Sequence, residues 1–286
     1  DVMRFLDNVL TDFIEKAPDS FKDAKYSAMR ERSVGLGVMG LHSYFQQKKI
    51  PFGSVMSKIW NKKVFKDIQK KVDSASVVLA EERGPCPDAE EYGIKERFSN
   101  KTAIAPTASI SIICGGTSPG VEPIAANSFT HKTLSGSFNV RNRYLEKILE
   151  KHNKNDDETW SSITTNQGSV SHLDFLTQQE KDVFKTAFEL DQKWIVELGA
   201  DRTPHISQAQ SINIFVPADI HKKELHQIHF QAWKKGLKSL YYCRSKSIQR
   251  AENVNDAKLT DVTANVYKSK NQQNEEQEYE ECLSCQ

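Results

Sequence analysis

The sequence predicts an α/β fold over residues 1–244 and a flexible acidic tail over residues 245–286. Three observations support this division. Several long segments carry apolar residues at spacings of three and four, which is typical of amphipathic helices. Residues 209–242 have the pattern strand, helix, strand with short turns, which favours parallel strands. After Arg244 large apolar side chains become rare, so the last segment cannot bury enough surface to offset its ordering entropy.

The composition favours a globular protein and argues against a nucleic-acid-binding, membrane-spanning or secreted one. The chain has 286 residues, and its 38% of hydrophobic residues is enough for a core. A formal net charge of +1 argues against nucleic-acid binding by bulk electrostatics. No apolar run approaches the roughly 18 residues that a membrane span needs, and no secretory signal opens the chain. Five cysteines, an odd number, favour a reducing, cytoplasmic setting. Because the chain starts at Asp1, we expect a processed product or a piece of a longer protein.

The N-terminal part is predicted to be helical. Residues 1–16 place apolar side chains on one face, and a second helix begins after the N-cap Ser54 and stops at Gly84. Between them, residues 35–40 contain a literal G-x-G-x-x-G, the pattern of dinucleotide-binding proteins. We reject that interpretation, because a polar run precedes it and the acidic residue expected about 20 positions later is missing. The glycines instead predict close packing of one helix on a neighbour.

Residues 103–123 form the stretch most suited to binding. A short apolar run, predicted as a buried strand, leads through Pro106 into Thr107, Ala108, Ser109 and Ile110, and then into a Gly/Pro/Ser cluster. Hydroxyl groups and backbone N–H groups freed at a strand end suit an oxyanion such as phosphate. The alternative is a polar turn without a ligand.

The later elements alternate between helix and strand. We expect a short strand at 129–132, a helix at 144–149, a polar loop at 151–171 and one helix from about 178 to 198 that ends at Gly199. A strand at 209–216, a helix capped by Asp219 and ended by Gly236, and a strand at 237–242 follow. His205, His221, His226 and His229 lie nearby without carboxylate or cysteine neighbours, so no metal site is expected.

Two short motifs carry redox chemistry. Cys282 and Cys285 form a C-x-x-C at the end of the tail, where a mobile dithiol can be oxidised at one place and reduced at another. The alternative is an incidental pair on a frayed end. Tyr241 and Tyr242 end a strand; neighbours in a regular strand point to opposite faces, whereas a local break would stack both rings. Stacked phenols would make a short relay for coupled electron and proton transfer.

Taken together, these motifs resemble the C-terminal half of the large, catalytic subunit of class I ribonucleotide reductase, and look especially like the bacterial and T-even-type phage versions. Residues 32–38 are similar to that family's helical glycine signature, residues 106–111 to its diphosphate loop, and residues 120–123 to the segment after it. The resemblance covers residues 1–286. It implies that the chain forms the C-terminal portion of the family's ten-stranded α/β barrel and is followed by a disordered tail.

The resemblance also implies an activity: reduction of ribonucleoside diphosphates to 2′-deoxyribonucleoside diphosphates by radical chemistry. Residues 106–110 would bind the substrate. Tyr241 and Tyr242 would pass the radical from the small subunit, and Cys282 with Cys285 would deliver electrons from thioredoxin or glutaredoxin. The chain itself would hold no cofactor. A diiron–tyrosyl radical is expected in the small subunit, and ATP and deoxynucleotide effectors are expected on the N-terminal half of the large subunit.

Departures from the family pattern leave alternatives open. The chain has no Asn-x-Cys-x-Glu segment, whose cysteine becomes the thiyl radical, and Cys86, Cys114 and Cys243 do not fall in the contexts of the active-site disulfide. We therefore expect that the chain is active only together with a separate N-terminal half. We expect it to act in the cytoplasm, or in the host cytoplasm if a phage encodes it. The alternatives are a stand-alone dithiol carrier that binds a phosphorylated ligand and a non-catalytic assembly subunit.

Overall fold

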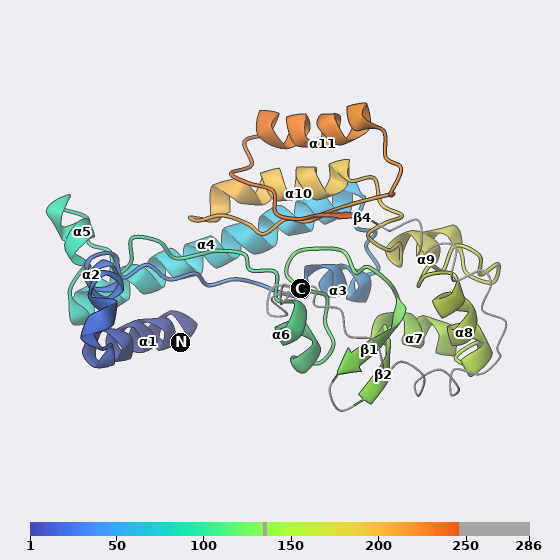
Figure 1. The fold of residues 1–286 in the computed structure, drawn as a ribbon, viewed down its shortest axis with the longest axis horizontal. Helices are drawn as coiled ribbons and strands as arrows, with labels where there is room; N and C mark the ends of the chain where they lie inside the picture. Colours follow the sequence, from blue (N-terminus) through green and yellow to red (C-terminus); the bar gives the residue numbers. More distant parts are fainter. Residues whose placement is uncertain (134–135, 246–286) are drawn as a thin grey trace, which may run out of the picture.

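A computed structural model describes residues 1–133 and 136–245 of the chain (Figure 1). Helices predominate, and two small sheets lie among them. Within these ranges no helix is both long and apolar enough to cross a membrane. In chain order the elements are α1 Val2–Lys16, η1 Asp19–Phe21, α2 Lys22–Glu31, α3 Leu41–Gln47, α4 Val55–Arg83, α5 Pro87–Glu91, α6 Ala108–Ile113, β1 Ser128–Thr133, β2 Gly136–Arg141, α7 Arg143–Lys151, α8 Asp157–Thr165, α9 Gln178–Val183, α10 Lys193–Arg202, η2 Thr203–His205, β3 Ile214–Val216, α11 Lys222–Lys234 and β4 Cys243–Ser245.

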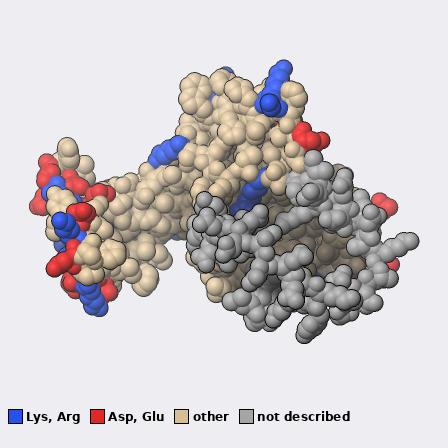
Figure 2. Space-filling view, viewed as in Figure 1, with Lys and Arg blue, Asp and Glu red and all other residues tan. Residues whose placement is uncertain are grey.

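The long helix α4 connects the two ends of the molecule (Figure 1). Its N-terminus is fixed as predicted, because the Ser54 hydroxyl accepts a hydrogen bond from the Ser57 N–H at 3.1 Å. One end of α4 packs against α1, with Met3, Val72 and Leu79 in a shared apolar cluster. At this end Lys, Arg, Asp and Glu side chains are interspersed on the visible surface (Figure 2).

Four extended segments lie side by side and run parallel at the centre. Leu36 pairs with Thr102, Ile104 pairs with Gln210, and β3 pairs with β4 in the register Ile214 to Cys243. Helix α11 connects β3 to β4, which confirms the predicted strand–helix–strand unit with parallel strands. Because the segments are parallel, their C-terminal ends lie at the same edge, where ligands bind in open α/β sheets.

The expected barrel is not seen among the described residues. They contain a parallel pair, an antiparallel hairpin and two isolated bridges, and the central segments are joined by single residue pairs in place of a continuous ladder. The hairpin is formed by β1, close to its predicted position, and β2, with Ser128 opposite Arg141. The chain therefore has mixed helix and strand, and its parallel central segments cover only part of a larger sheet.

The glycine-rich segment is extended, and the prediction of a helical packing motif was wrong. The Leu36 N–H donates to the carbonyl of Lys101, and the Ala103 N–H donates to the carbonyl of Leu36. A Cβ on Gly37 would lie 2.6 Å from the Ala103 carbonyl oxygen, so glycine is required for the close approach of two backbones.

Three further expectations in the C-terminal half were also wrong. Residues 157–165 form helix α8 where a loop was expected, because its buried Trp160 and Ile163 join the cluster around α7. The helix expected at 178–198 is two helices, α9 and α10. Helix α10 continues past Gly199, whose missing side chain makes room for Ile212: a Cβ there would lie 2.7 Å from Ile212 Cδ1.

The boundaries around α11 also differ from expectation. His221, and not Asp219, caps this helix, because the Ile220 N–H donates to the carbonyl of Pro217 in a turn that still includes residue 219. The strand expected at 237–242 begins later, at Cys243, although Tyr241 and Tyr242 already take part in its hydrogen bonding.

Candidate functional site

The predicted substrate loop lies directly after the central segment at Ile104. Thr107 has a left-handed backbone (φ 55°), and α6 begins at the next residue. The Thr107 hydroxyl accepts a hydrogen bond of 2.7 Å from the Gly120 N–H, so it keeps its own proton for donation elsewhere. Ser109 and Ile110 are exposed on α6, and Pro106 and Ala108 are half-buried.

A cavity of about 490 Å³ opens beside this loop. Two serines that line it are joined by reciprocal hydrogen bonds. The Ser43 N–H donates to the Ser118 hydroxyl at 3.1 Å, and the Ser118 N–H donates to the Ser43 hydroxyl at 2.8 Å. Its lining also includes the apolar side chains of Ile112 and Ile124. The cavity therefore offers small hydroxyl residues, which suit phosphate, and apolar side chains, which suit a larger group.

The wall of this cavity contains residues that sequence reasoning missed. The Asn142 side chain donates to Gln46 at 3.1 Å and to Asn127 at 2.8 Å, and it also caps α7. Asn127 in turn donates to the carbonyls of Gly168 and Phe184. An asparagine before the helical pattern at 144 was a visible capping signal, but its partners are distant in sequence.

His42 lies beneath the same wall and is fully buried. Its Nδ1 accepts from the Ile124 N–H at 3.0 Å. Burial lowers the pKa of His42 to about 3, against the opposing effect of a hydrogen bond to the Val183 backbone. The ring is therefore neutral near pH 7 and serves as an acceptor that holds the cavity wall.

The two tyrosines form a second group, with their rings side by side. The ring centroids are 4.1 Å apart at 50°, and the Tyr241 hydroxyl donates to the Tyr242 hydroxyl at 3.3 Å. Both side chains are partly exposed. The arrangement is the local break from strand geometry that the sequence left open as an alternative, and the Arg244 guanidinium lies 5.9 Å from the Tyr242 ring centroid.

A buried carboxylate is hydrogen-bonded to Asn213, which in turn contacts the tyrosine pair. Glu122 accepts a hydrogen bond of 2.6 Å from the Asn213 N–H and one of 3.1 Å from the Asn213 side-chain amide. Burial raises the pKa of Glu122, and the bonds from Asn213 and the charges of Arg244 and Arg202 oppose this rise. The Asn213 side-chain oxygen accepts from the Tyr242 N–H at 3.0 Å.

The remaining sulfur and histidine residues do not gather into a site. Cys86 is buried, Cys114 and Cys243 are exposed, and each of these three thiols is free. Across the described ranges, no group of three or more His, Cys, Asp and Glu side chains could hold a metal ion. Cys282 and Cys285 lie outside the described residues, as does the whole predicted tail from residue 246.

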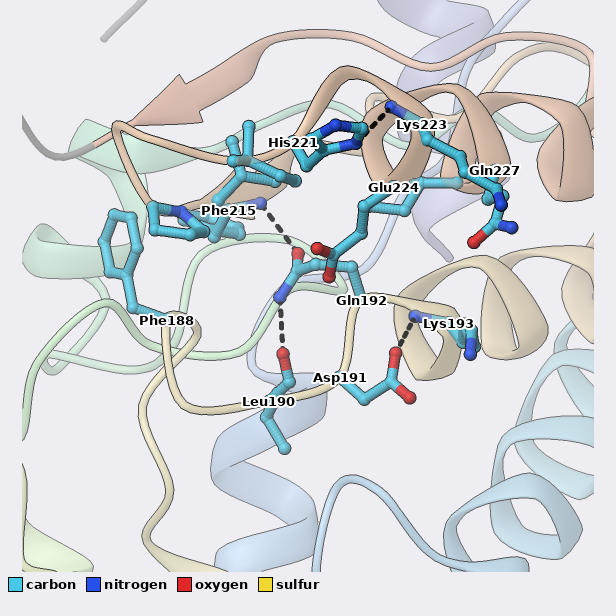
Figure 3. A pocket seen from close by; sticks show the side chains of 14 residues that line it. Phe188, Leu190, Asp191, Gln192, Lys193, Phe215, His221, Lys223, Glu224 and Gln227 are labelled. Atoms are coloured by element: carbon cyan, nitrogen blue, oxygen red, sulfur yellow. Dashed lines mark hydrogen bonds between the residues drawn. The ribbon is translucent and has the colours of Figure 1, made fainter.

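A different cavity, of about 640 Å³, lies between α11 and the loop before α10 (Figure 3). Gln192 is one of the residues that line it: it accepts from the Phe215 N–H at 2.7 Å and donates to the Leu190 carbonyl at 2.8 Å. The Lys193 N–H donates to Asp191 nearby. The described lining of this cavity includes neither the substrate loop nor the tyrosine pair.

The sequence and the fold match one family. The family model described as "Ribonucleotide reductase, barrel domain" matches residues 1–97 and 88–243, and the chain belongs to this family of large-subunit barrel domains. A solved structure titled "Actinobacillus ureae class Id ribonucleotide reductase alpha subunit" is similar with a TM-score of 0.79 and 39% identity; the match covers 86% of this chain and 45% of that one.

Curated relatives are ribonucleotide reductase large subunits. One from Invertebrate iridescent virus 6 is 50% identical over 89% of this chain and 27% of its own length. One from Invertebrate iridescent virus 3 is 44% identical over 91% of this chain and 41% of its own length. The chain thus spans less than half of these relatives. The family resemblance is confirmed, but the likeness to T-even phage is corrected, because these viral matches come from iridescent viruses.

Proposed function

We propose that the chain is the C-terminal part of a ribonucleotide reductase catalytic subunit that reduces ribonucleoside diphosphates to 2′-deoxyribonucleoside diphosphates. The observation that carries the proposal is the tyrosine pair, whose hydroxyls are hydrogen-bonded at 3.3 Å. A tyrosine is neutral near pH 7, since its pKa is about 10, so it loses a proton together with an electron. A phenoxyl radical on one ring takes a hydrogen atom from the other hydroxyl, and the radical moves without separation of charge.

The substrate would lie in the cavity beside α6. Thr107 donates its remaining hydroxyl proton, and exposed Ser109 offers a second donor, to the diphosphate oxygens. The small side chains of Pro106, Ala108 and the adjoining loop let the phosphates approach the backbone, with Ile110 at the outer side.

The remaining chemistry requires partners. An N-terminal half of the large subunit would supply the cysteine that becomes the thiyl radical and the ATP and deoxynucleotide effector sites. The small subunit would supply the diiron–tyrosyl radical. Loss of the 2′-hydroxyl as water would oxidise the active-site dithiol to a disulfide. Cys282 and Cys285 would then give two electrons and two protons to that disulfide by thiol–disulfide exchange, and thioredoxin or glutaredoxin would reduce them again in the cytoplasm.

Substitution of Tyr242 tests the relay. In the complex with the rest of the large subunit and the small subunit, Tyr242→Phe is expected to lower thioredoxin-dependent turnover to below about one per cent, because phenylalanine has no hydroxyl hydrogen to give up. The measurement is deoxyribonucleoside diphosphate formed per minute. Tyr92→Phe, at a tyrosine that is 81% exposed and far from the pair in sequence, is the matched control and should keep full turnover. Full turnover of Tyr242→Phe would refute the relay.

Substitution of Cys282 tests the tail. We expect Cys282→Ser to abolish turnover with thioredoxin and to preserve turnover driven by dithiothreitol, since a small dithiol reaches the active-site disulfide directly. Ser284→Ala, between the two cysteines, is the control for a general effect on the tail. Thioredoxin-dependent turnover that survives in Cys282→Ser would exclude the tail dithiol as the electron donor.

A further inference from the structure

The tyrosine pair lies where the parallel ladder contains an extra residue. From the register of β3 and β4, the Tyr242 N–H would donate to the Ile212 carbonyl. Instead the Tyr241 N–H takes that acceptor at 2.8 Å, and the Tyr242 carbonyl accepts from the Ile214 N–H at 3.0 Å. Two residues thus oppose the single residue Asn213, as in a β-bulge. This irregularity turns both rings toward one another.

A bulge leaves one backbone N–H without a partner in the ladder, here that of Tyr242. The Asn213 side-chain oxygen accepts it at 3.0 Å. Asn213 is almost fully buried, and its own backbone N–H and side-chain amide both donate to the Glu122 carboxylate. Because a buried carboxylate accepts from both donors, the Asn213 side chain is held in the one orientation that presents its oxygen to Tyr242.

The same carboxylate belongs to the segment that supports the substrate loop. Gly120, two residues before Glu122, donates its N–H to the Thr107 hydroxyl, and a Cβ at Gly120 would lie 3.0 Å from the Ala105 carbonyl oxygen. A chain of contacts therefore runs from Thr107 to the Tyr242 N–H. It consists of three residues of backbone from Gly120 to Glu122, a buried hydrogen bond between Glu122 and Asn213, and part-buried hydrogen bonds at Thr107 and Tyr242.

We propose that Glu122 is a positioning residue that couples the diphosphate loop to the tyrosine pair through Asn213. This inference rests on the proposed function and deepens it: the segment that supports the diphosphate loop also carries the buried carboxylate that holds Asn213 against the tyrosine pair. Glu122 touches neither the substrate nor the phenol oxygens in this scheme. It sets the bulge that keeps the two hydroxyls within hydrogen-bonding distance when the loop is in place.

The test is Glu122→Gln in the complete reductase, assembled with the small subunit. Whichever way the glutamine amide turns, its NH₂ group meets a donor of Asn213, so one buried hydrogen bond is lost. We expect kcat to fall about tenfold, while the dissociation constant of the nucleoside diphosphate changes less than about twofold. Damage to the substrate loop would instead raise the dissociation constant.

The double variant Glu122→Gln with Asn213→Asp restores every donor–acceptor pair. The introduced aspartate accepts from the Tyr242 N–H and from the amide of the introduced glutamine, and the glutamine oxygen accepts from the backbone N–H of residue 213. We expect kcat to return to within about threefold of the unsubstituted enzyme. If Glu122→Gln does not fold, Glu122→Asp keeps the charge but withdraws it by one methylene, and the same loss of kcat at constant affinity is expected.

The matched control is Gln192→Leu, which removes the acceptor of the Phe215 N–H from the same strand without a connection to Tyr242. An equal loss of kcat in this variant would assign the effect to general damage of β3 and overturn the inference. Unchanged kcat in Glu122→Gln would overturn it as well, and would leave the proposed function standing. An unsubstituted complex that forms no deoxynucleotide would refute the proposed function itself.

Discussion

At the scale of single residues, His42 makes the stability of the chain depend on pH. Its ordinary pKa of 6.5 applies to the unfolded chain, and burial lowers the value in the folded protein to about 3. Below pH 6.5 the unfolded state therefore binds a proton that the folded state does not, and stability falls as the pH is lowered from about 6.5 toward 3. One pKa unit is worth about 1.4 kcal/mol, so the loss by pH 5 is about 2 kcal/mol.

His42→Asn isolates this contribution, because asparagine keeps an acceptor for the Ile124 N–H but does not titrate. We expect the variant to be less stable than the native protein at pH 7, and the difference to shrink by about 2 kcal/mol at pH 5. The measurement is urea denaturation of both proteins across this range. Since all other titrating groups are shared, a stability difference that is independent of pH would contradict the role of His42.

At the scale of elements, local signals were sufficient where a segment buries one regular face. Helix α4 was predicted from the spacing of Phe65, Val72 and Leu79 and from the cap at Ser54, and all four residues serve as expected. Helix α8 was missed because it buries only a few side chains in a polar segment. Its N-cap Asp156, which accepts from the Thr159 N–H at 2.8 Å, was a usable signal.

Contacts between distant residues account for the other errors. The break between α9 and α10 is stabilised by Gln192. Its side-chain oxygen accepts a hydrogen bond from the Phe215 N–H, and its side-chain NH₂ group donates to the carbonyls of Ala187 and Leu190. The extended glycine segment depends on the backbone of residues 101–103. For the candidate site, the sequence indicated the loop and the tyrosines, but not Glu122 as the acceptor that joins them, since its partner lies 91 positions away.

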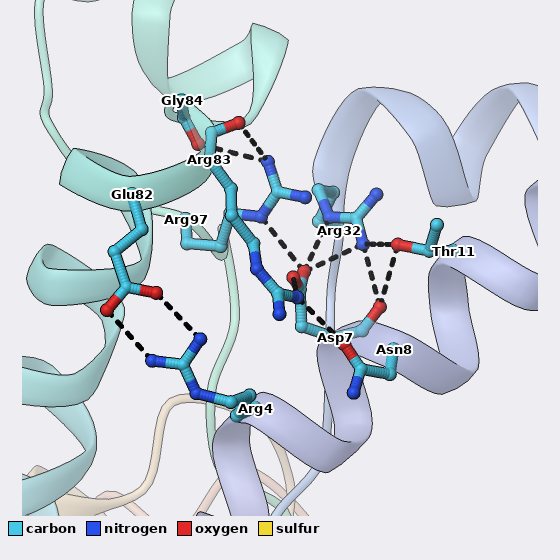
Figure 4. A network of polar contacts seen from close by, with 9 residues as sticks. All are labelled: Arg4, Asp7, Asn8, Thr11, Arg32, Glu82, Arg83, Gly84 and Arg97. Atoms are coloured by element: carbon cyan, nitrogen blue, oxygen red, sulfur yellow. Dashed lines mark hydrogen bonds and ion pairs between the residues drawn. The ribbon is translucent and has the colours of Figure 1, made fainter.

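At the scale of the whole molecule, the end that contains α1 has its own apolar cluster and a buried carboxylate that joins several elements. Asp7 of α1 accepts hydrogen bonds from Arg32 at the end of α2, from Arg83 at the end of α4 and from Arg97, at 2.9, 2.6 and 2.9 Å (Figure 4). Burial opposes the charge of Asp7, but these three arginines hold its pKa below the ordinary value of 3.8. The stabilisation is present above pH 4 and is lost only as the pH falls through the lowered pKa.

The two ends of the molecule should therefore respond differently to acid and to substitution. At pH 5 the wall around His42 is weakened, whereas α1 remains attached.

Asp7→Asn removes the charge that three arginines share and should cost about 3 kcal/mol at neutral pH, because a buried ion pair loses one partner. Hydrogen exchange of the α1 amides is expected to accelerate about a hundredfold, with little change in α7. Arg4→Gln breaks the more exposed pair with Glu82, where solvent screens the charges, and should leave the exchange rates of the α1 amides nearly unchanged. Equal protection of α1 in Asp7→Asn and the unsubstituted protein would show that the apolar contacts of Met3 alone hold this helix.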